Sequence, residues 1–311
     1  MKIKPFHETL NQPTYDKTYT VEQGEFAPLL FVCFFIVAIF AAALSSYRFG
    51  NMDTTYNQEM EDLREILSET SEEPDTPEIS IAPETEEIPE DNLDKKNHKQ
   101  TMPDAEKLAD MNQLYGLNED TVGWLTIDDT NIDYPVMQTP DDEEFYLDRD
   151  FNKNYSANGS LILDTESDIG TGTLECNYAD GSLPSTNLII HGHNMKNGAM
   201  FGNLDLYRKI DYEKKHNIIK LSTLTEKREY EIVSVFLSQV YLKSQTDVFK
   251  YYKFFEAYNE DEFNDFYKNI KELQLYDTGV TAEYGDEFIT LSVCAYHVDN
   301  GRLVVVGKRI K

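Results

Sequence analysis

The residues best suited to chemistry lie near the C-terminus of this 311-residue chain. Two runs rich in β-branched and apolar residues, 287–294 and 302–310, predict two strands joined by a polar segment. Cys294 closes the first strand and Arg302 opens the second. A guanidinium beside a thiol favours the thiolate, and it can bind the negative oxygen that forms when a carbonyl is attacked. The pair therefore indicates acyl transfer through a cysteine nucleophile.

This chemistry requires an open connection between the two strands. A tight two-residue turn at its end would leave Cys294 roughly 16 Å away from Arg302 along the strands. A wide loop over 295–301 would instead place the two backbones side by side, roughly 5 Å apart. We expect the wide loop. Ser292 precedes Cys294 by two residues, so strand alternation should put its hydroxyl on the same face.

A proton-transfer group has to come from elsewhere, because arginine does not deprotonate. An apolar run over 187–190 leads into the string His-Gly-His-Asn-Met. The end of a strand is a place where a site residue is expected to project. Both His191 and His193 are candidates there, and His297 lies in the loop that follows Cys294.

These strings resemble the sortases, the surface transpeptidases of Gram-positive bacteria, and class B sortases in particular. The resemblance rests on the order of several short motifs and covers about two thirds of the chain, from roughly Asp104 to the end. The motifs are Val122-Gly123-Trp124-Leu125, Asn131-Ile132-Asp133-Tyr134-Pro135-Val136, Gly159-Ser160-Leu161-Ile162, Gly192-His193-Asn194-Met195, Met200-Phe201, and Thr290-Leu291-Ser292-Val293-Cys294 followed by Arg302.

The resemblance implies a role for each residue of the candidate site. Cys294 would be the nucleophile, Arg302 would stabilise the oxyanion, and His193 would transfer protons. Two further positions are supporting residues in this interpretation: Ser292, whose position is associated with the site in class B relatives, and Asn194, which we expect to be structural.

His191 stands where the family pattern has an aromatic residue such as tyrosine. On an extended segment it would face the same side as His193, two residues on. We interpret it as a neighbour that tunes His193.

The activity implied is that of a cysteine transpeptidase. It would cleave a C-terminal sorting motif of secreted proteins after Thr and pass the acyl group to an amine of a peptidoglycan precursor or pilin. The implied reaction needs no cofactor. No metal is expected either, because the three scattered cysteines lack ligand spacing. Two other hypotheses stay open: a cysteine protease that passes the acyl group to water, and a non-catalytic surface binding module in which Cys294 is held in a disulfide with Cys176.

The composition is strongly acidic. There are 57 Asp and Glu against 28 Lys and Arg, which gives a formal net charge of −29. Because phosphate binding needs clustered basic residues, this balance argues against nucleic acid as a partner.

The first third of the chain predicts a membrane anchor and a tether. Residues 1–25 are polar and form a cytoplasmic tail in this interpretation. The apolar stretch 26–44 would be about 28 Å long as a helix, and it predicts one transmembrane helix over 26–46. Lysines before it weakly favour an inside N-terminus, and the sortase resemblance implies an extracellular catalytic domain.

Residues 47–103 are expected to be an extracellular acidic linker. A short helix over 55–68 is predicted within it by apolar spacing, and we expect this helix to be solvated. The stretch 71–92 is rich in Glu, Asp, Pro and Thr and is predicted to be disordered, because it lacks the apolar surface needed to fold.

The catalytic domain is assigned to 104–311. We expect a mainly β fold with accessory helices, in the form of an eight-stranded sortase-type barrel. The predicted strands are 122–127, 132–138, 160–164, 187–190, 218–221, 228–241, 287–294 and 302–310.

Two helices and a loop complete this prediction. One helix begins near Asp104 as its N-cap. A second is capped by Asn259 with Glu262 three residues on. Residues 165–186 form a long surface loop. The predicted buried face of the second helix consists of Phe263, Phe266, Tyr267, Ile270 and Leu273.

Overall fold

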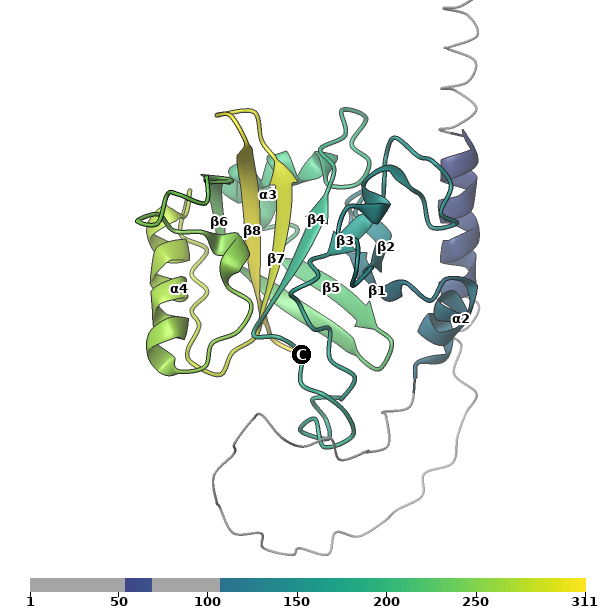
Figure 1. Cartoon of the computed structure of the whole chain (residues 1–311), viewed down its shortest axis with the longest axis horizontal. Helices are drawn as coiled ribbons and strands as arrows, with labels where there is room; N and C mark the ends of the chain where they lie inside the picture. The colour runs from purple at the N-terminus through teal and green to yellow at the C-terminus, as the bar shows by residue number, and fades with distance from the viewer. Residues whose placement is uncertain (1–53, 69–106) are drawn as a thin grey trace, which may run out of the picture. The chain divides into compact units, whose positions relative to one another are not determined.

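Eight strands close into a barrel in the order β1-β2-β3-β4-β7-β8-β6-β5 (Figure 1). The computed structural model describes residues 54–68 and 107–311. The strands are β1 (Thr121–Thr126), β2 (Asp133–Met137), β3 (Leu161–Leu163), β4 (Asn187–Gly192), β5 (Ile218–Thr223), β6 (Lys227–Gln239), β7 (Phe288–Cys294) and β8 (Gly301–Arg309). All eight predicted strands are confirmed, and so is the barrel.

Two of the strand pairs are parallel, and the site depends on one of them. β2 pairs with β3 and β4 pairs with β7 in parallel, while the other neighbours are antiparallel. Parallel strands end at the same edge of a sheet. The end of β4, which carries the histidines, therefore lies beside the end of β7, which carries Cys294.

Side-chain alternation along β7 separates two apolar clusters. Ile289, Leu291 and Val293 belong to the large cluster inside the barrel. Phe288 belongs to a second cluster outside it, with residues of α4 and of the β6–β7 connection. Because side chains alternate along a strand, Cys294 lies on the same outer face as Phe288.

Helix α4 (Glu260–Leu273) covers this outer cluster and packs against β6. The predicted cap is confirmed: the Asn259 side chain accepts a hydrogen bond from the Glu262 backbone N–H at 3.0 Å. Phe263, Phe266 and Ile270 are buried as expected. Leu273 is 43% exposed, so its place on the buried face was predicted wrongly. Leu273 is the last residue of the helix and lies beyond the buried positions Phe263, Phe266 and Ile270.

Helix α2 (Ala109–Leu117) begins later than predicted. Its N-cap position is occupied by Leu108, which makes no side-chain cap hydrogen bond. The Leu108 backbone N–H donates instead to the Leu224 carbonyl at 2.8 Å. This bond places Leu108 next to the β5–β6 turn, and its φ of −59° and ψ of 133° lie outside the helical range. The helix therefore begins at Ala109, and Asp104, the cap proposed for it, lies outside the described residues.

The helix over 54–68 packs on the barrel and is not solvated. Tyr56, Met60 and Leu63 are buried in the same cluster as the barrel interior. Arg64 forms an ion pair with Asp133 at the start of β2, with a 2.6 Å contact. The expectation of a solvated helix is wrong, because its apolar stripe has a partner. The compact unit that contains the barrel begins at Thr55.

Short helical segments and one long connection complete the fold. The segments are η1 (Phe145–Asp148), η2 (Gly202–Arg208), α3 (Ile210–Glu213) and η3 (Tyr251–Lys253). The 165–186 connection is a surface loop that is tied back to the barrel, because the Tyr178 hydroxyl hydrogen-bonds both Glu287 and Arg309.

Within 54–68 and 107–311, none of the helices has the length and apolar character needed to cross a membrane. The transmembrane prediction for 26–46 lies outside the described residues, as does the disordered stretch 71–92.

Candidate active site

Cys294 and Arg302 are register partners on neighbouring antiparallel strands. The connection between them is the wide loop 295–300, closed by a 2.9 Å hydrogen bond from the Ala295 N–H to the Gly301 carbonyl. This confirms the loop that the chemistry required. The thiol and the guanidinium therefore start from adjacent backbone positions at one end of the barrel.

The Arg302 side chain is held by the loop main chain. Its Nη1 donates to the carbonyls of Gly301 at 3.0 Å and Asn300 at 3.3 Å. No carboxylate among the residues the structure describes forms an ion pair with it. The positive charge is thus oriented but not neutralised, which suits a group that binds developing negative charge.

Ser292 lies on the outer face with Cys294, as predicted, and it has a partner that the sequence did not reveal. Its hydroxyl is 2.7 Å from the hydroxyl of Tyr251 in η3, and both residues are buried. Burial raises the pKa of Tyr251 to about 12, although the hydrogen bond to Ser292 and the charge of Arg302 oppose the rise. The tyrosine therefore stays neutral and contacts the strand of the nucleophile through Ser292.

Asn194 connects the end of β4 to the nucleophile strand. Its side-chain amide donates to the backbone carbonyl of Cys294 at 2.7 Å. This contact adds to the parallel pairing of β4 with β7, in which His191 lies opposite Ser292. The supporting role predicted for Asn194 is consistent with this geometry.

His193 follows β4 directly, and its ring is fixed by a main-chain contact. The Nε2 atom lies 2.7 Å from the carbonyl oxygen of Leu147 in η1. A carbonyl oxygen only accepts, so Nε2 carries the proton and Nδ1 keeps its lone pair. Nδ1 is therefore the nitrogen left for proton transfer.

Gly159 makes this arrangement possible. It has a φ of +59°, and a Cβ at this position would lie 2.4 Å from the Leu147 oxygen and 3.0 Å from Cδ2 of His193. Only glycine fits both the backbone conformation and the space. This gives a physical reason for the glycine in the Gly-Ser-Leu-Ile motif.

His191 is engaged away from His193. Its Nε2 lies 3.2 Å from Oδ2 of Asp164, the residue that follows β3. Burial alone would raise the pKa of Asp164, but the hydrogen bond from His191 and nearby positive charge outweigh it and lower the pKa. The interpretation of His191 as a residue that tunes His193 has no direct contact in its favour.

Cys176 and Cys294 are both free thiols, the first exposed and the second half-buried. This contradicts the disulfide on which the binding-module hypothesis depended. Cys176 lies in the 165–186 loop, where the Thr173 hydroxyl accepts its backbone N–H at 3.4 Å.

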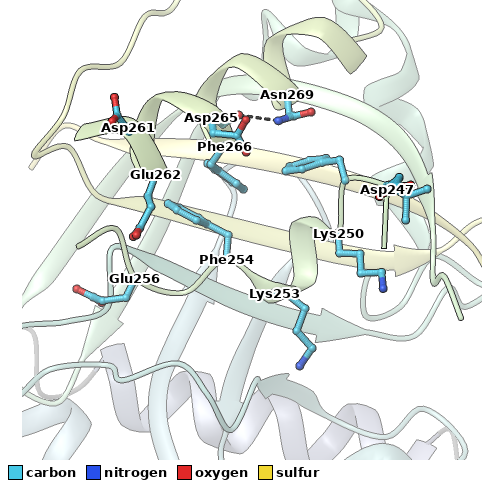
Figure 2. Close-up of a pocket in the computed structure, with 12 residues that line it drawn as sticks. Asp247, Lys250, Lys253, Phe254, Glu256, Asp261, Glu262, Asp265, Phe266 and Asn269 are labelled. Carbon is cyan, nitrogen blue, oxygen red and sulfur yellow. Dashed lines mark hydrogen bonds between the residues drawn. The ribbon is translucent and has the colours of Figure 1, made fainter. Parts of the chain in front are cut away.

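The surface of the described residues has two notable hollows. One of about 610 Å³ is lined by Asn194, Tyr296 and His297 together with residues of η2. The other, of about 690 Å³, lies between α4 and the β6–β7 connection, where Figure 2 shows Phe254 and Phe266 face to face among acidic side chains. Their rings are stacked at 4.0 Å. The first hollow is the one that shares residues with the site.

Three partners in this site could not be read from the sequence: Tyr251, the Leu147 carbonyl and Asp164. Each is far from its partner along the chain, and none belongs to a sequence motif that indicates a catalytic role. The assembled groups are a thiol, an oriented guanidinium, an imidazole with one free nitrogen and a buried tyrosine hydroxyl. Together they are suited to nucleophilic attack on a carbonyl with stabilisation of the oxyanion.

Comparison with known proteins agrees with this fold. The family model described as "Sortase domain" matches residues 125–310. The chain is 31% identical over 217 residues to sortase B of Listeria monocytogenes, which covers 69% of this chain and 80% of the relative. It is 26% identical over 203 residues to sortase B of Staphylococcus aureus, covering 64% and 73% of the two chains.

Solved structures are similar as well. A sortase B of Bacillus anthracis in complex with AAEK1 superposes with a TM-score of 0.54 at 29% identity, covering 68% of this chain and 90% of the other. A substrate complex of Staphylococcus aureus sortase B gives a TM-score of 0.59 at 21% identity, with coverage of 83% and 96%, and at that identity it supports the fold alone.

The chain belongs to the sortase family. Within that family it is a class B sortase and therefore a cysteine transpeptidase.

Proposed function

We propose that this sortase is anchored in the cell membrane through 26–46, with its N-terminus inside and its catalytic domain outside. Its substrates are secreted proteins that carry a C-terminal sorting motif, which it cleaves after Thr. The acyl group passes to an amine of a peptidoglycan precursor or a pilin. The observation that carries this proposal is the placement of Cys294 opposite Arg302 beside the His193 segment.

In the first half of the reaction, the Cys294 thiolate attacks the Thr carbonyl carbon and forms a carbon–sulfur bond. Arg302 binds the oxyanion of the tetrahedral intermediate. The carbon–nitrogen bond then breaks as charged His193 gives a proton from Nδ1 to the leaving amine. The Leu147 carbonyl keeps the ring in place through Nε2 during this step.

In the second half, the acceptor amine attacks the thioester and His193 takes up its proton. The thiolate of Cys294 leaves, and a new amide bond links the two substrates. The hollow lined by Asn194, Tyr296 and His297 supports entry of the acceptor from the side of the β7–β8 loop.

The test uses peptides of the Asn-Pro-Gln-Thr-Asn and Pro-Xaa-Thr-Gly types, with and without an added amine. Triglycine is the first amine to try, because a sortase B structure complexed with triglycine matches this fold with a TM-score of 0.58. We expect a ligated product that depends on the amine and disappears in Cys294→Ala. Hydrolysis at the same rate with and without the amine would support the cysteine protease instead.

A further inference from the structure

Three side chains able to bind a metal meet beside β4, outside the proposed catalytic group. They are Glu143, Asp164 and His191, and one ligand atom from each lies within 4.8 Å of the other two. Glu143 comes from the β2–η1 connection, Asp164 follows β3, and His191 lies in β4. Three segments that are separate along the chain thus contribute one donor each.

The spacing of His191 and Asp164 fits a small, tetrahedral cation. His191 Nε2 and Asp164 Oδ2 are 3.2 Å apart. Bonds of about 2.0 to 2.1 Å in tetrahedral geometry place two Zn²⁺ ligands roughly 3.3 Å from each other. Glu143 is exposed, so rotation of its side chain can bring its carboxylate to the same centre. An imidazole with two carboxylates suits Zn²⁺ better than Ca²⁺ or Mg²⁺, which take mainly oxygen ligands.

The central carboxylate is already positioned by contacts of its own. Asp164 is 7% exposed, and its Oδ1 accepts the Glu166 backbone N–H at 3.0 Å. Gln138 donates to the Asp164 main-chain carbonyl at 2.9 Å. Contacts of this kind around a ligand orient it before an ion arrives and raise metal affinity.

The local charge also favours a cation. Glu143 and Asp164 bring two carboxylates to the same point. The neighbouring positive group, Lys253, forms an ion pair with Glu166 at 2.7 Å and not with either carboxylate of the cluster. A divalent ion would remove the repulsion between the two carboxylates.

We propose that Glu143, Asp164 and His191 bind one Zn²⁺ ion, which ties the β2–η1 connection to β3 and β4. The site has three protein ligands and leaves the remaining coordination to water, so the ion is exchangeable. It lies on the strand that leads to His193, and His191 is the register partner of Ser292. A bound ion therefore stabilises the edge of the barrel on which the active site is built, without entering the acyl transfer itself.

The test is calorimetric titration of Zn²⁺ into the full chain, purified without a histidine tag. All three cysteines are replaced by Ser in this parent, so that thiolates cannot bind the metal. We expect one ion per chain and a rise in Tm with Zn²⁺. His191→Gln, Asp164→Asn and Glu143→Gln should each weaken binding by at least about 10-fold, the loss that even outer-shell changes cause.

His216→Gln is the matched control, because this histidine lies outside the cluster, with Nδ1 at 3.1 Å from the Asp128 carbonyl. It should bind Zn²⁺ like the parent. Thermal unfolding without metal checks that each variant is folded, and the exposed Glu143 provides a variant that does not disturb the core. The proposal would be overturned if the parent did not bind Zn²⁺. It would also be overturned if His191→Gln and Glu143→Gln bound Zn²⁺ as tightly as the parent. Transpeptidation is not measured, so this result is independent of the proposed function.

Discussion

At the level of single residues, Arg302 is the group whose role can be tested most sharply. Its guanidinium is oriented by two main-chain carbonyls, and we propose it as the oxyanion donor. Arg302→Ala should lower kcat by about 100- to 1,000-fold, as loss of one oxyanion donor does. Arg302→Lys should recover only part of the lost kcat, because an ammonium lacks the planar set of N–H donors of a guanidinium. Steady-state kinetics with a sorting-motif peptide that the enzyme cleaves measures kcat for both variants. Wild-type turnover in Arg302→Ala would refute the oxyanion role of Arg302.

The Tyr251–Ser292 hydrogen bond permits a second prediction. Both hydroxyls are buried, so Tyr251→Phe and Ser292→Ala each leave one group unpaired, at a cost of about 1 to 3 kcal/mol in the free energy of unfolding. The double variant should lose less than the sum of the two, because neither hydroxyl then remains to be satisfied. Denaturant unfolding of the wild type, the two single variants and the double variant gives the coupling free energy of the two hydroxyls. Simple additivity would show that the contact contributes no pairwise stability.

Residue types alone predicted part of the site. Cys294 and Arg302 could be placed opposite each other because the chemistry demanded a wide loop, and the loop is there. Tyr251, Leu147 and Asp164 could not be predicted, because their contacts come from tertiary folding between segments tens of residues apart. His191 was assigned to His193 through its spacing in sequence, yet a carboxylate on β3 engages it.

At the level of elements, Gly159 controls how the β2–β3 connection meets His193. Gly159→Ala should reduce stability by about 1 to 3 kcal/mol through its positive φ. It should also lower kcat, because the added methyl pushes against the Leu147 oxygen and the His193 ring. Gly116→Ala, in helix α2, is the matched control because a Cβ there meets nothing within 4 Å. The prediction fails if the two variants unfold at the same temperature and turn over equally.

Strands were easier to predict than helix ends. Runs of β-branched and other apolar residues marked all eight strands, since such side chains fit the pleated, half-buried surface of a sheet. The start of α2 was misplaced because a main-chain bond from Leu108 to Leu224 fixes it, and such a bond leaves no trace in side-chain pattern. The cap of α4 was predicted correctly because it depends on Asn259 and Glu262 themselves.

At the level of the whole molecule, the helix over 54–68 extends the folded unit beyond the domain that the sequence indicated. Its apolar spacing predicted the helix but could not name the surface that it covers. The buried Tyr56, Met60 and Leu63 show that this surface is the barrel. Any soluble form of the enzyme should therefore retain this helix.

Docking of this helix gives a pH-dependent prediction. Burial, with a contribution from Asp150, raises the pKa of Glu59 from 4.5 to about 7, although hydrogen bonds from Asn152 oppose the rise. Between these pH values the folded chain binds a proton that the unfolded chain has lost, so this group's contribution to stability falls as pH rises through the window.

Glu59→Gln should accordingly raise Tm at pH 8, where the carboxylate is charged, and change it little at pH 5. The exposed Glu65→Gln on the same helix should show no such difference between the two pH values. Thermal unfolding of the three proteins at both pH values is the measurement. A lower Tm for Glu59→Gln at pH 8 would mean that the charged form is favoured in the folded chain.

The central claim, that Cys294 carries the acyl group between two substrates, is tested most directly by the mass of the trapped enzyme. The full chain is mixed with a sorting-motif peptide, quenched in acid and analysed intact and after proteolysis. We predict a thioester adduct that ends at Thr, maps to Cys294 and is discharged by triglycine into a ligated product. An adduct on Cys176, or product formation that persists in Cys294→Ala, would contradict it.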